Sequence, residues 1–186
     1  MASLQRKVLE KYPNKYFVET GTCWGDTVQL ALECGFEKII TMEISAEKVK
    51  HNEERFSKEI SEGRVEIFYG DTVDIFQDAI GKIDSNATFW LDAHWDDGPK
   101  GEYLCPLPIE LDILINHPIK EHTILIDDKR LFGVPNTTWG HTIDLDGIVD
   151  LLYDINSNYT ISYEDGCVPK DIIVAKIKNE KSLYPL

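Results

Sequence analysis

The chain has 186 residues, of which 42% are hydrophobic, so it is long enough for one domain and apolar enough for a substantial core. Its 33 acidic and 19 basic side chains give a formal net charge of −14. Such a surface repels nucleic-acid phosphates and anionic lipid, which argues against nucleic acid or a membrane as the main partner. We expect a single domain over residues 1–186 that acts on a neutral ligand, or on one neutralised by a metal ion.

The cysteines and the hydrophobic runs bear on the compartment of the protein. The four cysteines are widely spaced and form no C-x-x-C pair, which argues against a structural zinc site and a disulfide-rich scaffold. The first residues lack the apolar segment of a signal peptide, and no run is long enough to cross a bilayer. We therefore expect a reduced, cytoplasmic protein.

Apolar periodicity predicts helices and strands in alternation. In chain order the predicted elements are a helix over 3–11, a strand over 15–20, a helix over 26–35 with Asp26 or Thr27 near its N-cap, a strand over 37–45, a helix over 46–60, a strand over 64–70, a helix over 72–80, a strand over 87–93, a helix over 108–116, a strand over 122–128, a helix over 144–156, and strands over 159–166 and 171–179.

This alternation predicts an α/β fold with a doubly wound, mostly parallel sheet that has helices on both faces. The last two strands are joined by a short turn with glycine and proline, so we expect them to pair antiparallel. A Rossmann-like, seven-stranded sheet whose last strand inserts antiparallel accounts for this series. Ligands of such sheets bind beyond the carboxyl ends of the strands, so the residues at strand ends are the candidates for function.

The first strand runs into the loop E-T-G-T-C-W-G-D-T, in which Gly21 and Gly25 allow a tight turn and close approach of a ligand. The pattern is neither the dinucleotide fingerprint G-x-G-x-x-G nor a P-loop. Glu19, just before the loop, repels phosphate and favours a ligand with an amine or a cationic centre. An ordinary turn between a strand and a helix is the alternative interpretation.

Acidic residues also end the next two strands. Glu43 follows Gly21 by roughly 20 positions, the spacing at which an acid accepts hydrogen bonds from ribose hydroxyls. A capping or solvated glutamate is the alternative. Asp71 follows the third strand, where we expect it either to cap the next helix or to contact the edge of an adenine ring.

Together these residues resemble the class I S-adenosylmethionine-dependent methyltransferases, over roughly residues 15–179. The E-T-G-T-x-x-G-x-T loop is similar to the first motif of that family, and Glu43 matches its ribose-binding acid. The resemblance implies the strand order 3-2-1-4-5-7-6 and S-adenosylmethionine as the cofactor. It implies a cofactor site that comprises Glu19, Gly21, Thr22, Gly25, Thr27, Glu43, Ile44, Asp71 and Asp92.

Further acids follow the fourth and fifth strands. Asp92 comes directly after the apolar run T-F-W-L, and Asp127 and Asp128 follow I-L-I. These two strands are neighbours in a doubly wound sheet, so the three carboxylates should lie close together and repel one another unless a cation lies between them. Oxygen ligands suit Mg²⁺, Mn²⁺ or Ca²⁺. Capping roles for these aspartates are the alternative.

The same acids are similar to those of metal-dependent O-methyltransferases, in particular the macrocin-type sugar O-methyltransferases. Asp92, Asp127 and Asp128 match the positions that hold a divalent ion in that group, where the ion chelates two vicinal sugar hydroxyls. That group usually has a second acid where this chain has His94. The resemblance implies methyl transfer to a hydroxyl of a sugar, as a glycan or glycoside and for example a rhamnose-like one.

This chemistry requires a base near neutral pH, and histidine is the natural choice. By the alternation of a strand, His94 lies on the same side as Asp92, so we expect Asp92 as ligand and His94 as base. Asp92 acting as both is the competing assignment, and a His94 that only packs in the core is a third.

Other side chains are expected near this site, on a lid or acceptor wall over 95–107 and beyond it. They are Trp95, Tyr103, Glu110, Trp139 and His141. A catechol-type O-methyltransferase remains an alternative, which a base such as Lys129 would favour. A metal-dependent hydrolase that uses the acidic cluster is another. A non-catalytic binding module is disfavoured because unpaired buried carboxylates cost stability.

Overall fold

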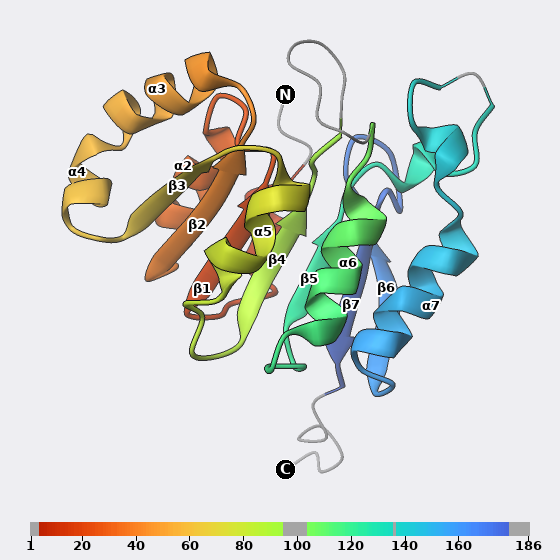
Figure 1. Cartoon of the computed structure of the whole chain (residues 1–186). Helices are drawn as coiled ribbons and strands as arrows, with labels where there is room; N and C mark the ends of the chain where they lie inside the picture. Colours follow the sequence, from red (N-terminus) through yellow and green to blue (C-terminus); the bar gives the residue numbers. More distant parts are fainter. Residues whose placement is uncertain (1–3, 95–103, 136, 179–186) are drawn as a thin grey trace, which may run out of the picture.

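The computed structural model of the chain describes residues 4–94, 104–135 and 137–178. Its strands form one seven-stranded sheet in the order β3-β2-β1-β4-β5-β7-β6 (Figure 1). The strands are β1 (Tyr16–Thr20), β2 (Lys38–Glu43), β3 (Val65–Tyr69), β4 (Ala87–Leu91), β5 (Thr123–Ile126), β6 (Tyr159–Glu164) and β7 (Ile172–Ile177). Strands β1 to β5 pair in parallel, whereas β7 runs antiparallel to both β5 and β6. The predicted order and the antiparallel last strand are confirmed.

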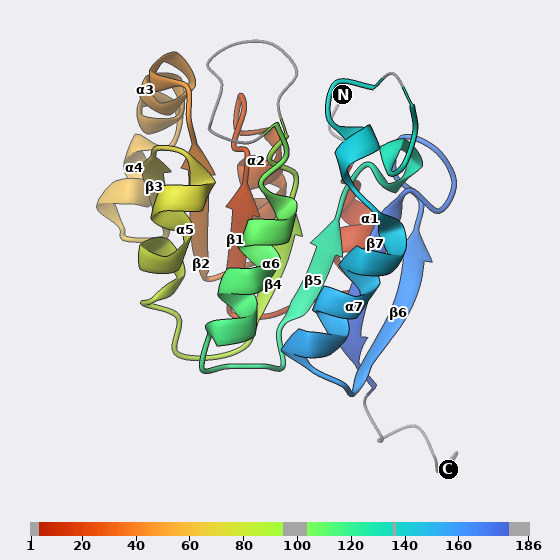
Figure 2. The same ribbon diagram turned by 45° about the vertical axis from the view of Figure 1, so that its right-hand side comes forward.

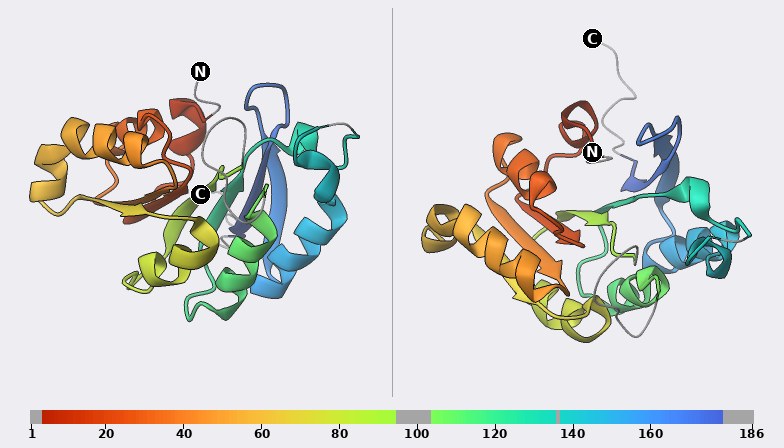
Figure 3. Two further views of the ribbon diagram at one scale, coloured as in Figure 1. Left: turned by 45° about the horizontal axis from the view of Figure 1, so that its top comes forward. Right: turned by 90° about the horizontal axis from the view of Figure 1, so that it is seen from above.

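Helices cover both faces of this sheet, as the view from above shows (Figure 3). The helices are α1 (Arg6–Leu9), α2 (Asp26–Glu33), α3 (Ala46–Arg55), α4 (Ser57–Ser61), α5 (Thr72–Ile80), α6 (Leu107–Asn116) and α7 (Leu145–Ile155), with short 3-10 turns η1 (Lys129–Leu131) and η2 (Gly140–Thr142). Helices α5, α6 and α7 lie on one face, and α6 packs beside α7 (Figure 2). None of the helices in the described ranges combines the length and apolar character needed to cross a bilayer.

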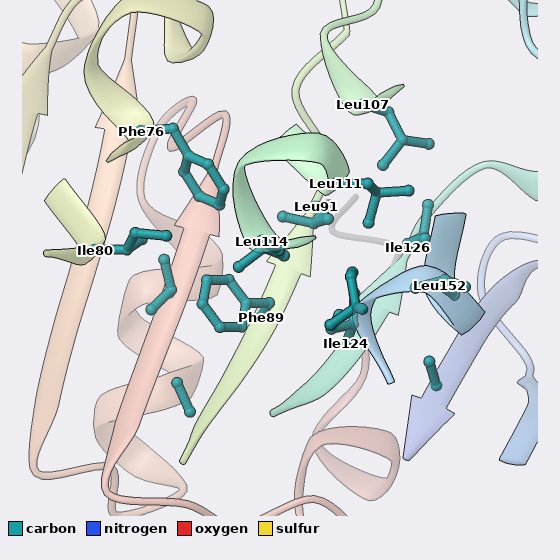
Figure 4. Close-up of a cluster of buried hydrophobic side chains, with 14 of the residues drawn as sticks. Phe76, Ile80, Phe89, Leu91, Leu107, Leu111, Leu114, Ile124, Ile126 and Leu152 are labelled. Atoms are coloured by element: carbon teal, nitrogen blue, oxygen red, sulfur yellow. The ribbon is translucent and has the colours of Figure 1, made fainter. Parts of the chain in front are cut away.

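The alternation of each strand divides the core into two layers. Phe89, Leu91 and Ile124 point to the face that α5, α6 and α7 cover (Figure 4). Trp90 and Leu125 point to the opposite face, where α1 and α2 pack. Each large side chain buried in this way contributes roughly 1.5–3 kcal/mol to stability. Burial on both faces explains why these central strands read as continuous apolar runs.

Several predicted elements differ from the structure at their ends. The helix predicted over 46–60 is two helices, because the backbone of Phe56 (φ −108°, ψ 23°) interrupts it and its ring enters the core. Helix α2 begins at Asp26 with Gly25 at the N-cap, so Asp26 and Thr27 lie next to the cap, as expected. Strands β4 and β5 end at Leu91 and Ile126, so the acids that follow lie just beyond the sheet.

Candidate functional site

The glycine loop after β1 is shaped by contacts that only glycine permits. Gly21 has a φ of +84°, and a Cβ there would lie 3.0 Å from the carbonyl oxygen of Asp92. Gly25 has a φ of +81°, and a Cβ there would lie 2.1 Å from Oδ1 of the buried Asn52. Asn52 in turn donates from Nδ2 to the carbonyl of Cys23 at 2.8 Å. The loop is therefore held against both the end of β4 and helix α3.

Glu19 is buried beneath this loop. Its Oε2 accepts a hydrogen bond from the Thr41 hydroxyl at 2.8 Å, and the hydroxyls of Thr41 and Thr22 lie 2.6 Å apart. Burial raises the pKa of Glu19 to about 8, although hydrogen bonds from Thr41 and Thr27 oppose the rise. The carboxyl is therefore mostly protonated at neutral pH, and a nearby ligand ammonium group would favour its ionised form.

Glu43 closes the loop from the end of β2. Its Oε2 accepts from the backbone N–H of Cys23, and its Oε1 accepts from that of Ser45, both at 2.8 Å. Each carboxylate oxygen can accept a second hydrogen bond, so these contacts leave capacity for ligand hydroxyls. Ile44 follows and is half-buried. Asp71 caps α5 by accepting from the N–H of Val73 at 3.3 Å, which confirms the capping interpretation.

Asp92, His94 and Asp128 come together beyond β4 and β5. His94 Nδ1 lies 3.6 Å from Asp92 Oδ1, and its Nε2 lies 3.3 Å from Asp128 Oδ2. One potential ligand atom from each of the three lies within 4.8 Å of the others, and Asp127, Asp128 and Asp171 form a second such set. Asp128 belongs to both sets, so it is the centre of the acidic group.

The charges in this group act on one another. Burial, followed by the negative charges of Asp127 and Asp128, raises the pKa of Asp92 well above its ordinary value. The backbone N–H of Asp92 donates to the Thr20 hydroxyl at 3.3 Å. A cation placed between these carboxylates would remove the repulsion and favour their ionised forms.

Trp139, which was expected near this site, packs against His94. Its side chain is buried and its ring centre lies 4.7 Å from that of His94, with 36° between the planes. Phe132 packs against the edge of the same indole. The indole of Trp139 therefore packs against the imidazole of His94 and restricts its orientation.

Two residues of this region escaped the sequence analysis. Arg130 contacts the carboxylates of Asp128 and Asp171 through Nη1, and Asp171 is fully buried. A basic residue two positions after an acidic pair is a signal for an internal ion pair. Asp171 opens β7, and only the placement of β7 beside β5 brings it to the site.

We compared the chain with known proteins. No family model matches its sequence, and no curated protein does. Solved structures do match. The O-methyltransferase TomG from Streptomyces achromogenes, solved with S-adenosylmethionine, has a TM-score of 0.60 at 10% identity over 94% of this chain and 78% of TomG. The O-methyltransferase from Bacillus cereus, solved with S-adenosylhomocysteine, has a TM-score of 0.60 at 13% identity over 93% of this chain and 78% of its own.

A third neighbour is the methyltransferase domain of a bacterial CtHen1-C, with a TM-score of 0.60 at 17% identity over 94% of this chain and 95% of that domain. This is the class I methyltransferase fold. In that fold the glycine loop, Glu43 and Asp71 lie at the carboxyl edge of the sheet, the same edge at which Asp92 and Asp128 meet.

Glu110 of this methyltransferase fold lies inside the protein, between α6 and the end of β1. Its side chain is fully buried, and Oε2 lies 3.5 Å from the Thr20 hydroxyl. Oε1 has no hydrogen-bond partner among the described residues. Burial raises the pKa of Glu110 to about 8, so the carboxyl is mostly neutral at pH 7.

The remaining candidates are engaged elsewhere or lie outside the described residues. His141 is exposed, and its Nδ1 lies 2.9 Å from the carbonyl oxygen of Thr137. Lys129 Nζ lies over the ring of Tyr163, 5.3 Å from its centre. Trp95 and Tyr103, with most of the expected lid over 95–107, fall outside the described residues.

Proposed function

We propose that the chain is a divalent-metal-dependent O-methyltransferase that moves a methyl group from S-adenosylmethionine to a hydroxyl of a sugar, as a glycan or glycoside. The observation that supports this most is the convergence of Asp92, His94 and Asp128 at the same sheet edge as the glycine loop and Glu43. A donor site and an acceptor site would then share the end of β4, since Gly21 packs against Asp92.

The cofactor half of the proposal rests on the loop and the acids around it. Glu43 is fixed by two backbone N–H groups and retains acceptor capacity for the ribose hydroxyls. Glu19 lies beneath the loop, where its carboxyl can accept from the amine of the cofactor. Neither residue favours a phosphate, so a nucleoside without a pyrophosphate is the better match.

The metal half rests on the donor atoms. Asp92, Asp127 and Asp128 offer hard oxygen ligands from two neighbouring strand ends, which suits Mg²⁺, Mn²⁺ or Ca²⁺. The raised pKa of Asp92 reflects burial and mutual repulsion, a cost that a bound cation offsets. When bound, such an ion supplies acidification and orientation of an acceptor hydroxyl.

His94 then has a defined task. Its imidazole accepts the proton of the acceptor hydroxyl while the oxygen bonds to the methyl carbon, whose bond to sulfur breaks to leave S-adenosylhomocysteine. Asp128 Oδ2 lies within hydrogen-bond distance of the imidazole, 3.3 Å from Nε2, and Asp92 Oδ1 lies 3.6 Å from Nδ1. The ring of Trp139 packs against the imidazole. Asp92 as the base is the competing assignment.

Titration calorimetry tests the proposed cofactor site and the proposed metal site separately. Wild-type protein should bind S-adenosylhomocysteine and, independently, Mn²⁺. Asp127→Asn should weaken Mn²⁺ binding strongly, because it removes one of few carboxylates, and should leave cofactor binding unchanged. Asp146→Asn, a change in the first turn of α7, is the matched control and should alter neither. Failure of the wild type to bind S-adenosylhomocysteine at millimolar concentration would reject the proposed function.

A catechol-type acceptor is the second candidate, because vicinal phenols chelate a metal as vicinal sugar hydroxyls do. Lys129, the lysine nearest the acidic pair in sequence, packs over Tyr163, which does not favour it as a base. Comparing turnover of rhamnosides with that of catechols separates the two acceptors. Phosphatase activity without S-adenosylmethionine would instead support a metal-dependent hydrolase.

A further inference from the structure

Arg130 lies between two carboxylates that come from distant parts of the chain. Its Nη1 contacts Oδ1 of Asp128, which follows β5, and Oδ2 of Asp171, which precedes β7. The backbone N–H of Arg130 also donates to Asp171 Oδ1 at 3.0 Å, and that of Lys129 donates to the Asp171 carbonyl at 3.0 Å. Asp171 therefore uses both side-chain oxygens and its carbonyl to hold the turn that follows the acidic pair.

The two oxygens of Asp128 face different groups. Oδ1 is occupied by Arg130, while Oδ2 lies 3.3 Å from His94 Nε2. The backbone of Asp128 is left-handed, with φ 58° and ψ 29°, a conformation that aspartate adopts more readily than most non-glycine residues. With Oδ1 of Asp128 in contact with Arg130, Oδ2 is the oxygen that faces His94.

The guanidinium of Arg130 contacts both Asp128 and Asp171. Arg130 is therefore a cation that lies beside a proposed metal ligand. The negative charge of Asp171 offsets the positive charge of Arg130. Without it, the guanidinium would pair with Asp128 alone and would compete with an incoming cation for that carboxylate.

We propose that Asp171, acting through Arg130, is a positioning residue that holds Asp128 ready to bind a divalent cation on its His94 side. The inference rests on the proposed function, because Asp128 is assigned there as a metal ligand. It adds the β6–β7 hairpin to the site. A pair that merely pinned the turn would support stability and leave both the orientation of Asp128 and its metal affinity unchanged.

The test is the Asp171→Asn variant, which keeps the shape of the side chain and an acceptor for the Arg130 N–H but removes the charge. We expect the dissociation constant for Mn²⁺, measured by electron paramagnetic resonance of the free ion, to rise about 10- to 100-fold, as for other residues that orient metal ligands. Binding of S-adenosylhomocysteine should be unchanged. Asp165→Asn, an exposed change in the same hairpin that keeps an acceptor for the Lys170 N–H, should alter neither constant.

A crystal structure of the metal-free Asp171→Asn variant supplies a readout that needs no ion, and we expect Asp128 Oδ2 to turn away from His94. If Asp171→Asn does not fold, Arg130→Gln replaces it, since its shorter and uncharged side chain removes the Nη1 that contacts both carboxylates. The inference is overturned if the Asp128 side chain of the variant keeps its wild-type orientation. It is also overturned if the wild type binds Mn²⁺ and the variant binds it with the same affinity. A wild type that binds no Mn²⁺ rejects the metal role, and the metal-free structure still decides the positioning role.

Discussion

The imidazole of His94 lies between the carboxylates of Asp92 and Asp128, and the indole of Trp139 packs against it. Each ring nitrogen therefore faces one carboxylate. Asp92 lies beside the same imidazole, and its raised pKa makes it the competing candidate for the base. The two assignments differ in what happens when the imidazole alone is removed.

His94→Gln should lower kcat by about 10²- to 10⁴-fold, the usual contribution of a general base, while the dissociation constant for S-adenosylhomocysteine stays the same. The measurement is kcat of the variant and of the wild type at saturating substrate. A variant that keeps its kcat would assign the proton to Asp92.

The two glycines that flank helix α2 have similar backbone angles, but substituting them should cost different amounts of stability. Gly25 and Gly35 flank helix α2 with φ values of +81° and +87°. A Cβ at Gly25 would collide with Asn52 and Phe56, whereas one at Gly35 would meet nothing within 4 Å. The pair therefore separates backbone strain from steric conflict.

Gly35→Ala should cost about 1–2 kcal/mol in unfolding free energy, because it forces a side chain into the left-handed region. Gly25→Ala should cost about 1–3 kcal/mol more, since Asn52 must also move. It should in addition weaken binding of S-adenosylhomocysteine, because Asn52 holds the loop through Cys23. Urea unfolding and calorimetry check both, and equal costs for the two variants would contradict the role of Asn52.

The elements themselves were predicted well because their signals are local. Central strands such as β4 are buried on both faces and read as apolar runs, and the helices α5 and α7 have clear amphipathic periods. The break at Phe56 was missed because the apolar period continues across it. The capping role of Gly25 was missed because it depends on contacts with α3, which lies further along the chain.

Within the site, the sequence predicts which acids meet but not how they are arranged. The meeting of Asp92 with Asp128 follows from the parallel pairing of β4 and β5, whereas Asp127 lies in a second set with Asp128 and Asp171. The role of Asp171 depends on the insertion of β7 beside β5, and its contact with Arg130 spans 41 positions. No local pattern in the chain specifies that contact.

The whole molecule carries a net charge of −14 and also buries several of its acids. Burial raises the pKa of Glu19 and that of Glu110 to about 8, from 4.5 in the unfolded chain. Above pH 4.5 the unfolded chain releases these protons while the folded protein keeps them until about pH 8. The contribution of Glu19 and Glu110 to the free energy of unfolding is therefore fully present below pH 4.5 and is lost as the pH rises toward 8.

Glu110→Gln should flatten this decline, because the amide resembles the protonated carboxyl and does not titrate. The unfolding free energy of the variant relative to wild type should increase between pH 5.5 and 7.5, on the order of 1 kcal/mol per pH unit. Urea unfolding at the two pH values provides the comparison. Glu53→Gln, an exposed change on α3, is the control, and parallel pH curves for all three proteins would refute a neutral buried Glu110.

The position of β7 between β5 and β6 has a consequence during synthesis. A nascent chain that has emerged only as far as β6 can pair β1 to β5, yet the outer edge of β5 stays open and Arg130 has no access to Asp171. The acids after β4 and β5 then remain without their full set of partners until β7 leaves the ribosome. The order of translation thus delays assembly of this corner until β7 can enter the sheet, whereas the glycine loop after β1 and its partners on β2 and α3 are synthesised earlier.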